Sequence, residues 1–563
     1  MSPAPVLSST LDALADLAEI RGAAVEAVDL RSAAAAIGNL GPAAAAALER
    51  RTQRNNLSDE PGISTRLHRT LREVTLGGAE AALAAARCGI PMLLRRLLEL
   101  GVVNSHEAAF LVRELGIVTL SDLQAALDDD RLTRAADRSL GARLRPVVGL
   151  LEQESRLVPL GRATDVLETV LAAIERLSPS IDLLTAAGDV RRFEALASSL
   201  ILVGRASDPA RAIELLDAMG AVDGVLHRSA RRAILLIQQH EVDVRVAAPD
   251  DYGTVLFGAT GSRRHVRAVH ERRGRPRLAA GESALYAHAG LPFIPPELRE
   301  GAGEVEAAAA GTLPVLVQRE HIRGDLHMHS TYSDGADPLD MMVGQCAALG
   351  YEYIAITDHS ERAAASRTVS RADLARQRRD IAVLRDRYPG MTILHGLEVD
   401  IMPDGRLDFE DAVLESLDIV LASLHDSARQ DAKTLTERCI RAIRHPLVTI
   451  ITHPANRLVG RRAGYALDFD EVFAAAAETG TALEVDGAPS HLDLDGELAR
   501  RAIAAGVTLA IDSDCHRARA LHRQMALGIG TARRGWVEPR HVLNTRPLPE
   551  VLAFIKRKRG RRS

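Results

Sequence analysis

Two histidines and a carboxylate within residues 324–334 could bind a metal ion. The segment reads GDLHMHSTYSD, which places His327 and His329 two residues apart and Asp334 five residues further on. Because alternate residues of an extended strand point to the same face, both imidazoles can reach one ion from the end of a strand. An HxH pair alone is weak evidence, so the prediction depends on whether other segments supply further ligands.

Six further donors stand at the ends of short apolar segments in the C-terminal part of the chain. These segments are YIAIT, ILHGLEVD, IVLASLH, VTIITHP and VTLAIDSDCH. Apolar runs that alternate with helical segments predict a parallel, barrel-like α/β domain, in which chemistry collects at the carboxyl ends of the strands. The full candidate set is His327, His329, Asp334, His359, Glu398, His425, His453, Asp514 and His516.

These nine side chains predict a multinuclear metal centre. Neutral imidazoles and carboxylates suit Zn²⁺, Mn²⁺ or Fe²⁺, and nine donors exceed what one ion needs, so two or three divalent ions are expected. Such ions activate a bound water and clamp a phosphate, which is the chemistry of phosphoester hydrolysis. The expected catalytic group is a metal-bound water held by the cluster, with no separate catalytic residue. Cys515, between two ligands, is expected to pack rather than to bind.

Three arginines follow His453 in the segment HPANRLVGRRAGY. Arg457, Arg461 and Arg462 are candidates for binding the phosphate of a substrate, because guanidinium groups form bidentate contacts with phosphate. The alternative is an arginine-rich loop that is simply solvated.

The composition is that of an ordinary globular protein of several domains. Its 563 residues exceed a single core, and the net charge of -5 means that a nucleic-acid partner would be held by local basic patches. Four widely spaced cysteines without a CxxC motif fit a reduced, cytoplasmic protein. No apolar run approaches the ~20 residues of a membrane helix, and residues 1–20 do not have the pattern of a secretory signal. We therefore expect no membrane partner, and we favour a monomer.

Periodicity divides the chain into five regions. Residues 1–180 are predicted to be helical, because apolar residues recur at helical spacing and alanine-rich runs favour helix. Residues 181–250 contain strand-like segments with one helix between them and predict a small α+β unit. Residues 251–300 form a second small unit, and the Pro-, Gly- and Ala-rich residues 301–320 predict a linker. Residues 321–563 form the domain with the candidate metal ligands.

The ligand motifs resemble those of the PHP (polymerase and histidinol phosphatase) domain. The matching segments are GDLHMHSTYSDG, ITDHS, GLEVDI, SLH, ITHPANRLVGRR and DSDCH, and all nine metal-binding positions of that family are matched. Over nearly its full length the chain further resembles bacterial family X DNA polymerases (PolX), in which helix-hairpin-helix, palm and thumb regions precede a PHP domain. The resemblance implies a multidomain α and α/β protein that ends in a distorted (β/α)7 barrel. It also implies Mn²⁺ or Zn²⁺ and 3′-5′ exonuclease, 3′-phosphatase or abasic-site cleavage activity.

The polymerase motifs depart from the family pattern. Ser199 and Ile201 stand where the family has the two aspartates of an Asp-x-Asp strand, and Asp189 replaces a serine. Two-metal nucleotidyl transfer needs carboxylates that bridge both ions, so the polymerase centre is predicted to be inactive. The polymerase remnants that still fit are Gly188, Arg191, Arg192, Asp243, Thr260, Gly261 and Ser262.

The hairpin motifs are also incomplete. The family's Gly-x-Gly turn, whose backbone NH groups bind phosphate, keeps only Gly101, and the first hairpin segment at residues 60–67 has one glycine. The first lysine of the chain is Lys433, which excludes Schiff-base lyase chemistry in the N-terminal half.

We therefore interpret the chain as a metal-dependent phosphoesterase that acts on DNA ends in repair, on a PolX-like scaffold. Three alternatives remain. A small-molecule phosphatase of the histidinol-phosphatase type would use the same metals. A non-catalytic DNA-binding scaffold would keep them only for stability. Residual polymerase activity would depend on Asp243 and Asp189.

Overall fold

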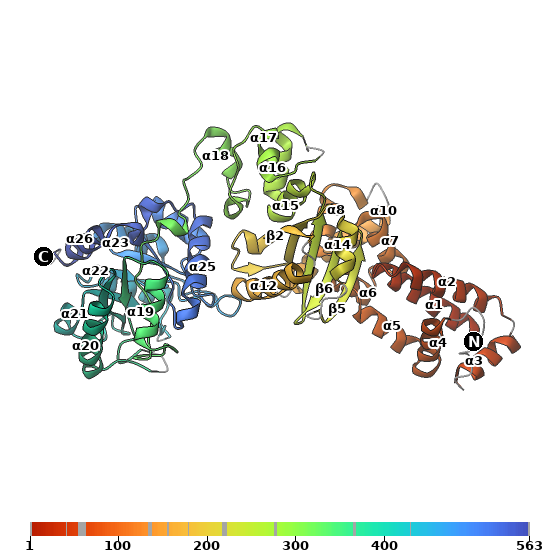
Figure 1. Ribbon diagram of the computed structural model, residues 1–563, viewed down its shortest axis with the longest axis horizontal. Coiled ribbons are helices and arrows are strands. Elements are labelled where there is room, and N and C mark those ends of the chain that lie inside the picture. The colour runs from red at the N-terminus through yellow and green to blue at the C-terminus, as the bar shows by residue number, and fades with distance from the viewer. Residues whose placement is uncertain are drawn as a thin grey trace.

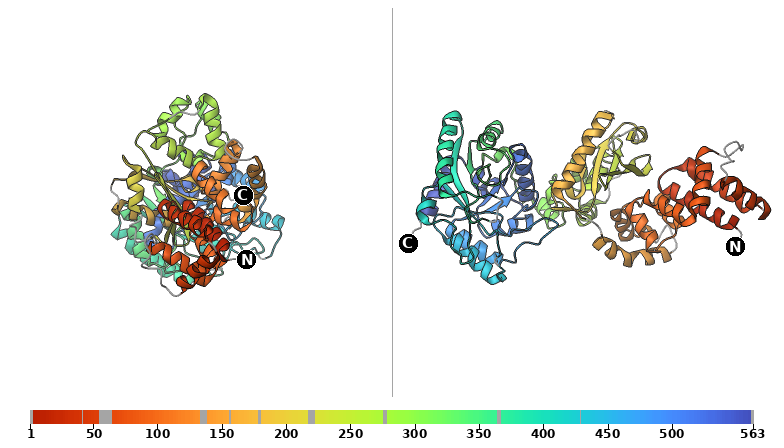
Figure 2. Two further views of the ribbon diagram at one scale, coloured as in Figure 1. Left: turned by 90° about the vertical axis from the view of Figure 1, so that its right-hand side faces the viewer. Right: turned by 90° about the horizontal axis from the view of Figure 1, so that it is seen from below.

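The protein has an elongated shape in which three bodies follow one another. The computed structural model describes residues 3–40, 42–53, 64–132, 138–154, 157–177, 180–216, 222–274, 278–363, 367–427 and 429–560. N-terminal helices lie at one end, a five-stranded sheet with a helical unit above it lies in the middle, and a barrel lies at the other end (Figure 1). Figure 2 shows the same succession from two further sides. The predicted multidomain α and α/β architecture is confirmed.

The N-terminal region consists of helices around one core of Leu, Ile, Val and Ala side chains. Its helix starts are well capped. Asn104 with Glu107, and Thr119 with Asp122, form capping boxes. Gly101 takes a positive φ in the turn between two helices, whereas residues 60–63 of the other hairpin segment lie outside the described residues. The helices are α1 (Pro3–Ile20), α2 (Ala24–Gly38), α3 (Pro42–Gln53), α4 (Thr65–Gly77), α5 (Ala79–Cys88), α6 (Met92–Glu99), α7 (Ser105–Leu115), α8 (Leu120–Asp128), α10 (Arg138–Leu144) and α11 (Val148–Glu154).

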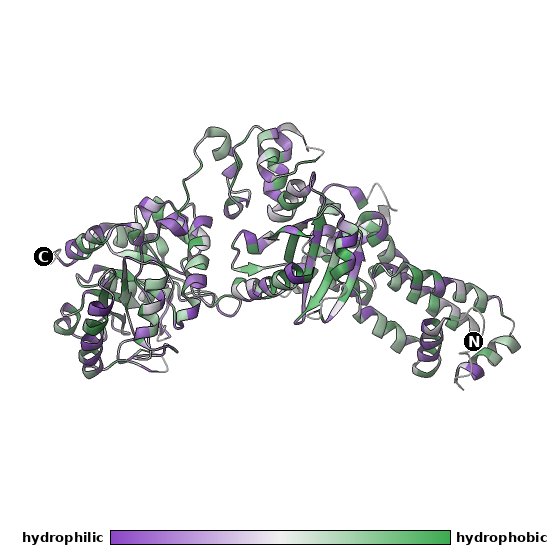
Figure 3. Cartoon of the chain, viewed as in Figure 1, coloured by the Kyte–Doolittle hydropathy of each residue, from purple (hydrophilic) through white to green (hydrophobic). Residues whose placement is uncertain are grey.

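The central sheet has the strand order β2-β4-β7-β6-β5, with β4 and β7 parallel and the other pairs antiparallel. Hydrophobic residues run along most of these strands (Figure 3), and two helices, α12 and α14, cover one face. The sequence patterns missed β2, an edge strand whose residues do not alternate between apolar and polar. The elements are β1 (Val158–Pro159), α12 (Leu160–Leu177), β2 (Asp182–Ala187), α13 (Gly188–Arg191), β3 (Leu196–Ala197), β4 (Leu200–Arg205), α14 (Pro209–Leu215), β5 (Gly224–Ser229), β6 (Arg232–Ile237) and β7 (His240–Ala247).

A small helical unit stands above the sheet (Figure 1, top). Residues 301–320, which were expected to be a linker, are not a free tether. They contain a helix, α18, and its Val305 and Ala308 pack with Leu316 into the core of this unit. Composition could not distinguish the two outcomes, because an alanine-rich segment also favours helix. The helices are α15 (Tyr252–Thr260), α16 (Arg263–Arg273), α17 (Glu282–His288) and α18 (Glu304–Ala310).

The C-terminal domain is a parallel seven-stranded sheet in which the strands neighbour one another in chain order. A parallel bridge between Met328 and Cys515 joins the segments that follow the two edge strands. The predicted distorted (β/α)7 barrel is thereby confirmed. Its strands are β8 (Gly324–Asp325), β9 (Tyr353–Ile356), β10 (Thr392–Asp400), β11 (Ile419–Ser423), β12 (Ile450–Ile451), β13 (Ala482–Asp486) and β14 (Leu509–Asp512).

Helices surround the barrel, and no helix among the described residues is long and apolar enough to cross a membrane. The strands are buried on both faces, which explains their continuous apolar sequences. The helices are α19 (Leu339–Ala348), α20 (Arg371–Arg387), α21 (Asp411–Glu415), α22 (Ala432–Arg444), α23 (Phe469–Thr479), α24 (Gly496–Ala504), α25 (Leu521–Arg534) and α26 (Leu548–Arg559).

The central sheet packs directly against the barrel. Val459, Leu492 and Leu527 of the barrel domain join the hydrophobic core of the sheet and α12. Gly530 of α25 lies against the ring of Phe193, in a position where any side chain would overlap that ring. The two domains therefore share a core.

Replacing Gly530 with alanine should loosen this shared core. The added methyl group would overlap the Phe193 ring, and overpacking of this kind costs about 1–3 kcal/mol. We expect a lower midpoint of urea unfolding, followed by circular dichroism. Gly258→Ala is the matched control, because Gly258 is a helical glycine in α15 with open space around it. It should be neutral or stabilising by up to about 1 kcal/mol. Equal midpoints for the two variants would contradict the packing.

Candidate metal centre

The buried carboxylate of Glu398, near the end of β10, lies at the centre of the candidate site. It is fully buried, and the carboxyl ends of the neighbouring strands direct imidazoles toward it. Ser423 and Thr452 each donate a hydroxyl hydrogen bond to Glu398 Oε1. The two carboxylate oxygens lie 2.7 to 3.6 Å from ring nitrogens of His327, His329, His359, His425 and His453.

Two aspartates and His516 complete the cluster. Asp514 Oδ1 lies 3.1 Å from His329 Nε2, and Asp334 Oδ1 lies 3.2 Å from His516 Nε2. The structure thus brings all nine side chains to one place. Within overlapping groups their ligand atoms lie no more than 4.8 Å apart. These groups are His329, Asp334, His359 and His516; His327, His329 and Asp514; and His359, Glu398 and His425.

The donor atoms fit divalent cations. Glu398 Oε2 and Asp334 Oδ1 are buried and accept no hydrogen bond, although imidazole nitrogens lie close to both. Buried polar atoms are rarely left without a partner, and a bound ion is one of the usual reasons. Imidazole nitrogens with carboxylate oxygens are the ligands of Zn²⁺, Mn²⁺ and Fe²⁺.

Carboxylates behind the imidazoles orient them. Glu484 of β13 lies 2.7 Å from His327 Nδ1 and accepts a hydrogen bond from the backbone NH of His453, and Asp400 contacts His425 Nδ1. Such partners direct the opposite ring nitrogen toward the metal. The sequence argument missed Glu484 and Asp400, although Glu484 stands near the end of an apolar strand and the strand-end rule could have found it.

The cluster perturbs the pKa values of its members. Burial lowers the pKa of His425, but the charges of Glu398 and Asp400 outweigh burial and raise it to about 10. Burial likewise opposes a rise for His516, whose contact with Asp334 brings its pKa to about 9. Burial would raise the pKa of Glu398, yet the surrounding imidazoles hold it well below its usual value. Without cations, protonated imidazoles therefore balance the carboxylates.

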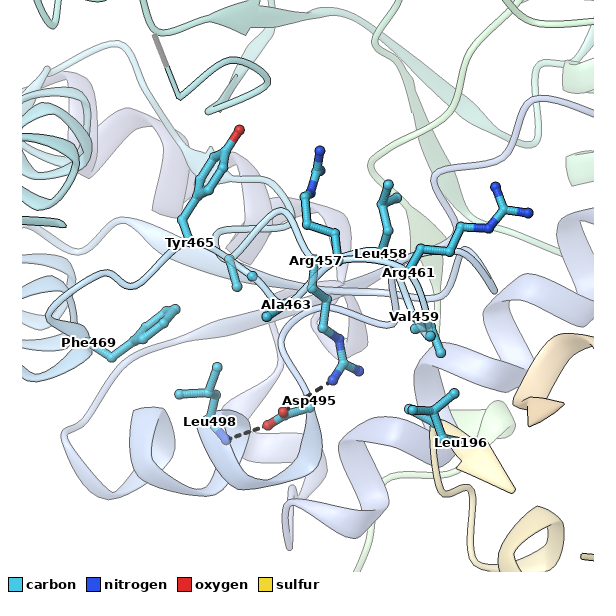
Figure 4. A pocket seen from close by; sticks show the side chains of 15 residues that line it. Leu196, Arg457, Leu458, Val459, Arg461, Ala463, Tyr465, Phe469, Asp495 and Leu498 are labelled. Atoms are coloured by element: carbon cyan, nitrogen blue, oxygen red, sulfur yellow. Dashed lines mark hydrogen bonds and ion pairs between the residues drawn. The ribbon is translucent and has the colours of Figure 1, made fainter. Parts of the chain in front are cut away.

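The predicted phosphate-binding arginines lie on the loop after β12, where they line a groove beside the sheet (Figure 4). The guanidinium group of Arg457 is used within the chain, since it donates to the carbonyl oxygen of His491 at 2.8 Å and pairs with Asp495 at 3.2 Å. Arg462 donates to the carbonyl oxygen of Asn456. Arg461 and Arg462 are exposed, whereas Arg457 is only partly so.

The remaining aspartate of the polymerase motif is neutralised by arginines. Asp243 of β7 forms ion pairs of 2.8 Å with Arg232 and 2.7 Å with Arg245. Burial would raise the pKa of Asp243, but the two guanidinium groups outweigh it and lower the pKa to about 2. Asp122 of α8 also pairs with Arg232, at 2.9 Å. The N-terminal helices are thus tied to this face of the sheet.

The other polymerase positions serve packing and capping. Ile201 stands opposite Asp243 in the register of β4 and β7 and packs in an apolar cluster. Asp189 pairs with Arg192 at 2.7 Å, and Ser262 caps α16. Among the described residues, every group that could hold a metal lies in the barrel. Others of these positions make close contacts: Gly188 lies near Ile201 and Ser199, Gly261 near His265, and Thr260 accepts a hydrogen bond from Arg191.

Loading the site with Mn²⁺ or Zn²⁺ should release protons. His425, with a pKa of about 10, and His516, with a pKa of about 9, are protonated at pH 7 in the metal-free protein, whereas a metal binds neutral imidazole. Metal affinity should therefore rise as the pH increases from 6 to 8. Titration calorimetry in two buffers of different ionisation enthalpy measures the released protons, and identical heats in both buffers would contradict the assignment.

Removal of the carboxylate behind His327 should weaken metal binding. Glu484→Ala should lower metal affinity about 10- to 100-fold, as is typical when a partner that orients a ligand is lost. Glu471→Ala, at an exposed position of α23, is the control. Competition with a fluorescent chelator measures both affinities. An unchanged affinity for Glu484→Ala would exclude the orienting role.

Comparison with known proteins agrees with this geometry. The PHP domain profile matches residues 325–456. The DNA polymerase/3′-5′ exonuclease PolX of Bacillus subtilis (strain 168) is 32% identical over 540 residues, which cover 91% of this chain and 94% of that protein. A "probable phosphatase" of Thermoanaerobacter sp. (strain X514) is 30% identical over 212 residues, or 36% of this chain and 79% of that protein.

Among solved structures, a histidinol phosphate phosphatase of Lactococcus lactis, complexed with zinc, L-histidinol and phosphate, is similar to 38% of this chain over 93% of its own length. Its sequence identity is 16% and its TM-score is 0.31. The match to the Bacillus subtilis relative spans almost all of both proteins and confirms the family resemblance. The chain therefore belongs to the PolX family and carries a PHP-type phosphoesterase domain on a PolX scaffold.

Proposed function

We propose that this protein is a cytoplasmic, metal-dependent phosphoesterase that processes DNA ends, as a 3′-5′ exonuclease, 3′-phosphatase or abasic-site enzyme in repair. The observation that carries the proposal is the buried Glu398 carboxylate with five imidazoles around it. We further propose that the nine clustered side chains hold two or three ions of Mn²⁺, Zn²⁺ or Fe²⁺.

The residues of the chain divide the work. Bound ions would supply Lewis acidity and an activated water for attack on phosphorus. Glu398 holds the imidazoles at fixed positions, and Glu484 and Asp400 set the ring orientations. Arg461 and Arg462, exposed on the loop after β12, are suited to hold a phosphate. Arg457 is suited to fix the shape of that loop, because its guanidinium group already binds other parts of the chain.

A DNA substrate is supported by the family and by local charge. The Bacillus subtilis relative is named as a DNA polymerase and 3′-5′ exonuclease. Exposed arginines on α16, including Arg264, Arg267 and Arg272, offer a basic surface for a phosphate backbone despite the negative net charge. We propose that the N-terminal half binds DNA through such patches.

We also propose that the polymerase centre is inactive. Ser199 and Ile201 offer no carboxylates, and the carboxylate of Asp243 is bound to two arginines. Two-metal nucleotidyl transfer needs free carboxylate oxygens on both ions. Displacement of both guanidinium groups would leave their charges buried and unpaired.

A small phosphomonoester is the second candidate substrate. The "probable phosphatase" relative covers only 36% of this chain, which indicates that similar sequence also occurs without the polymerase-like half. Turnover of a phosphomonoester that exceeds turnover of an oligonucleotide at equal concentration would favour this candidate.

Hydrolysis is tested with 5′-labelled single-stranded and gapped DNA. We expect the protein with Mn²⁺ to shorten the 3′ end, and we expect His329→Ala to reduce the rate at least about a hundredfold, because it removes a ligand shared by two groups. Ser199→Ala, in the polymerase-like half, should retain the wild-type rate. Absence of hydrolysis of DNA and of phosphomonoester with Mn²⁺, Zn²⁺ and Co²⁺ would refute the proposal.

Primer extension tests the polymerase-like half. With His329→Ala, which removes competing hydrolysis, a primed template and all four nucleotides should give no elongation in Mg²⁺ or Mn²⁺. Template-dependent addition that is lost in Asp243→Ala would show that the centre still works and would overturn this part of the proposal.

A further inference from the structure

The strand β13 contributes no residue to the nine-residue cluster, yet it too ends in a potential ligand. Asp486 is the last residue of β13, and His491 lies in the loop that follows. Ligand atoms of Asp486, His491 and Asp514 all lie within 4.8 Å of one another. Asp514 also belongs to the cluster around Glu398, so this second group adjoins the first.

Two atoms of the group lack hydrogen-bond partners. Asp486 is fully buried, and its Oδ2 atom accepts no hydrogen bond, while its Oδ1 atom accepts one from the backbone NH of Ala488. His491 Nδ1 is likewise buried and without a hydrogen bond. A buried carboxylate oxygen without a donor is costly. The cost is larger here, because the carboxylates of Asp514 and Glu484 are neighbouring charges.

The loop holds His491 in a defined position. The ring of His491 stacks on that of His453, with centroids 5.2 Å apart and planes inclined by 23°. The backbone NH of His491 donates to Ala488, and its carbonyl oxygen accepts from Arg457 at 2.8 Å. The imidazole is therefore fixed before any ligand arrives, which is what a preorganised site requires.

We propose that Asp486, His491 and Asp514 form an additional divalent-cation site beside the nine-residue cluster. Two carboxylates and one imidazole suit Mn²⁺, Zn²⁺ or Fe²⁺, and three protein ligands leave coordination positions open for water or a phosphate oxygen. Asp514 would bridge this cation and one held by His327 and His329. The site stands apart from the proposed function, because metal content rather than turnover defines it.

Metal content of the full-length protein tests the site. Wild type, Asp486→Asn and His491→Gln are stripped with chelator, reloaded with Mn²⁺ or Zn²⁺, desalted and analysed by plasma mass spectrometry. Both variants should hold about one equivalent less than wild type. Asp493→Asn is the matched control, since Asp493 is equally buried in the same loop but is outside the group. It should retain all equivalents.

Full metal content in both folded variants would overturn the proposal. If a variant fails to fold by circular dichroism, anomalous diffraction from wild-type crystals loaded with Mn²⁺ decides the matter. A peak about 2.0–2.2 Å from the donor atoms of Asp486, His491 and Asp514 is expected, and the absence of such a peak would refute the site. Loss of ions from His329→Ala reports on the main cluster independently, so the two claims can fail separately.

Discussion

A negative charge that is fully buried at Glu398 governs the C-terminal domain. A carboxylate removed from water is strongly destabilising unless cations surround it. In the metal-free chain, protonated imidazoles supply that compensation, as the raised pKa of His425 shows. Divalent ions would supply it better, because they also satisfy the oxygens that accept no hydrogen bond. The barrel, its closing bridge and the strand ends serve to hold this arrangement together.

The polymerase-like half has become a support for the barrel. Val459, from the loop that follows His453, is part of the core of the central sheet, and Phe193 packs against α25. The sheet face that would carry the polymerase metals is instead neutralised by arginines and tied to α8 through Asp122. Degeneration of one centre and support of the other are thus parts of one packing arrangement.

Much of the site could be predicted from sequence, because two simple rules apply to it. Alternation along a strand pairs His327 with His329, and the strand-end rule places the other seven residues of the set. The rules do not extend to atoms whose partners are distant in sequence. Arg457 was expected to face a phosphate, but its guanidinium group is held by His491 and Asp495, and no local pattern reports such contacts. The helix α18 was missed for a different reason, since alanine-rich segments are compatible with both a linker and a helix.

The most direct test of the central claim is the electron paramagnetic resonance spectrum of the protein loaded with Mn²⁺. Ions that share the Glu398 carboxylate must couple magnetically. The account predicts a broad, exchange-coupled signal from wild type. The hyperfine pattern of magnetically isolated Mn²⁺, or a spectrum of free Mn²⁺ alone, would contradict a multinuclear centre built around Glu398.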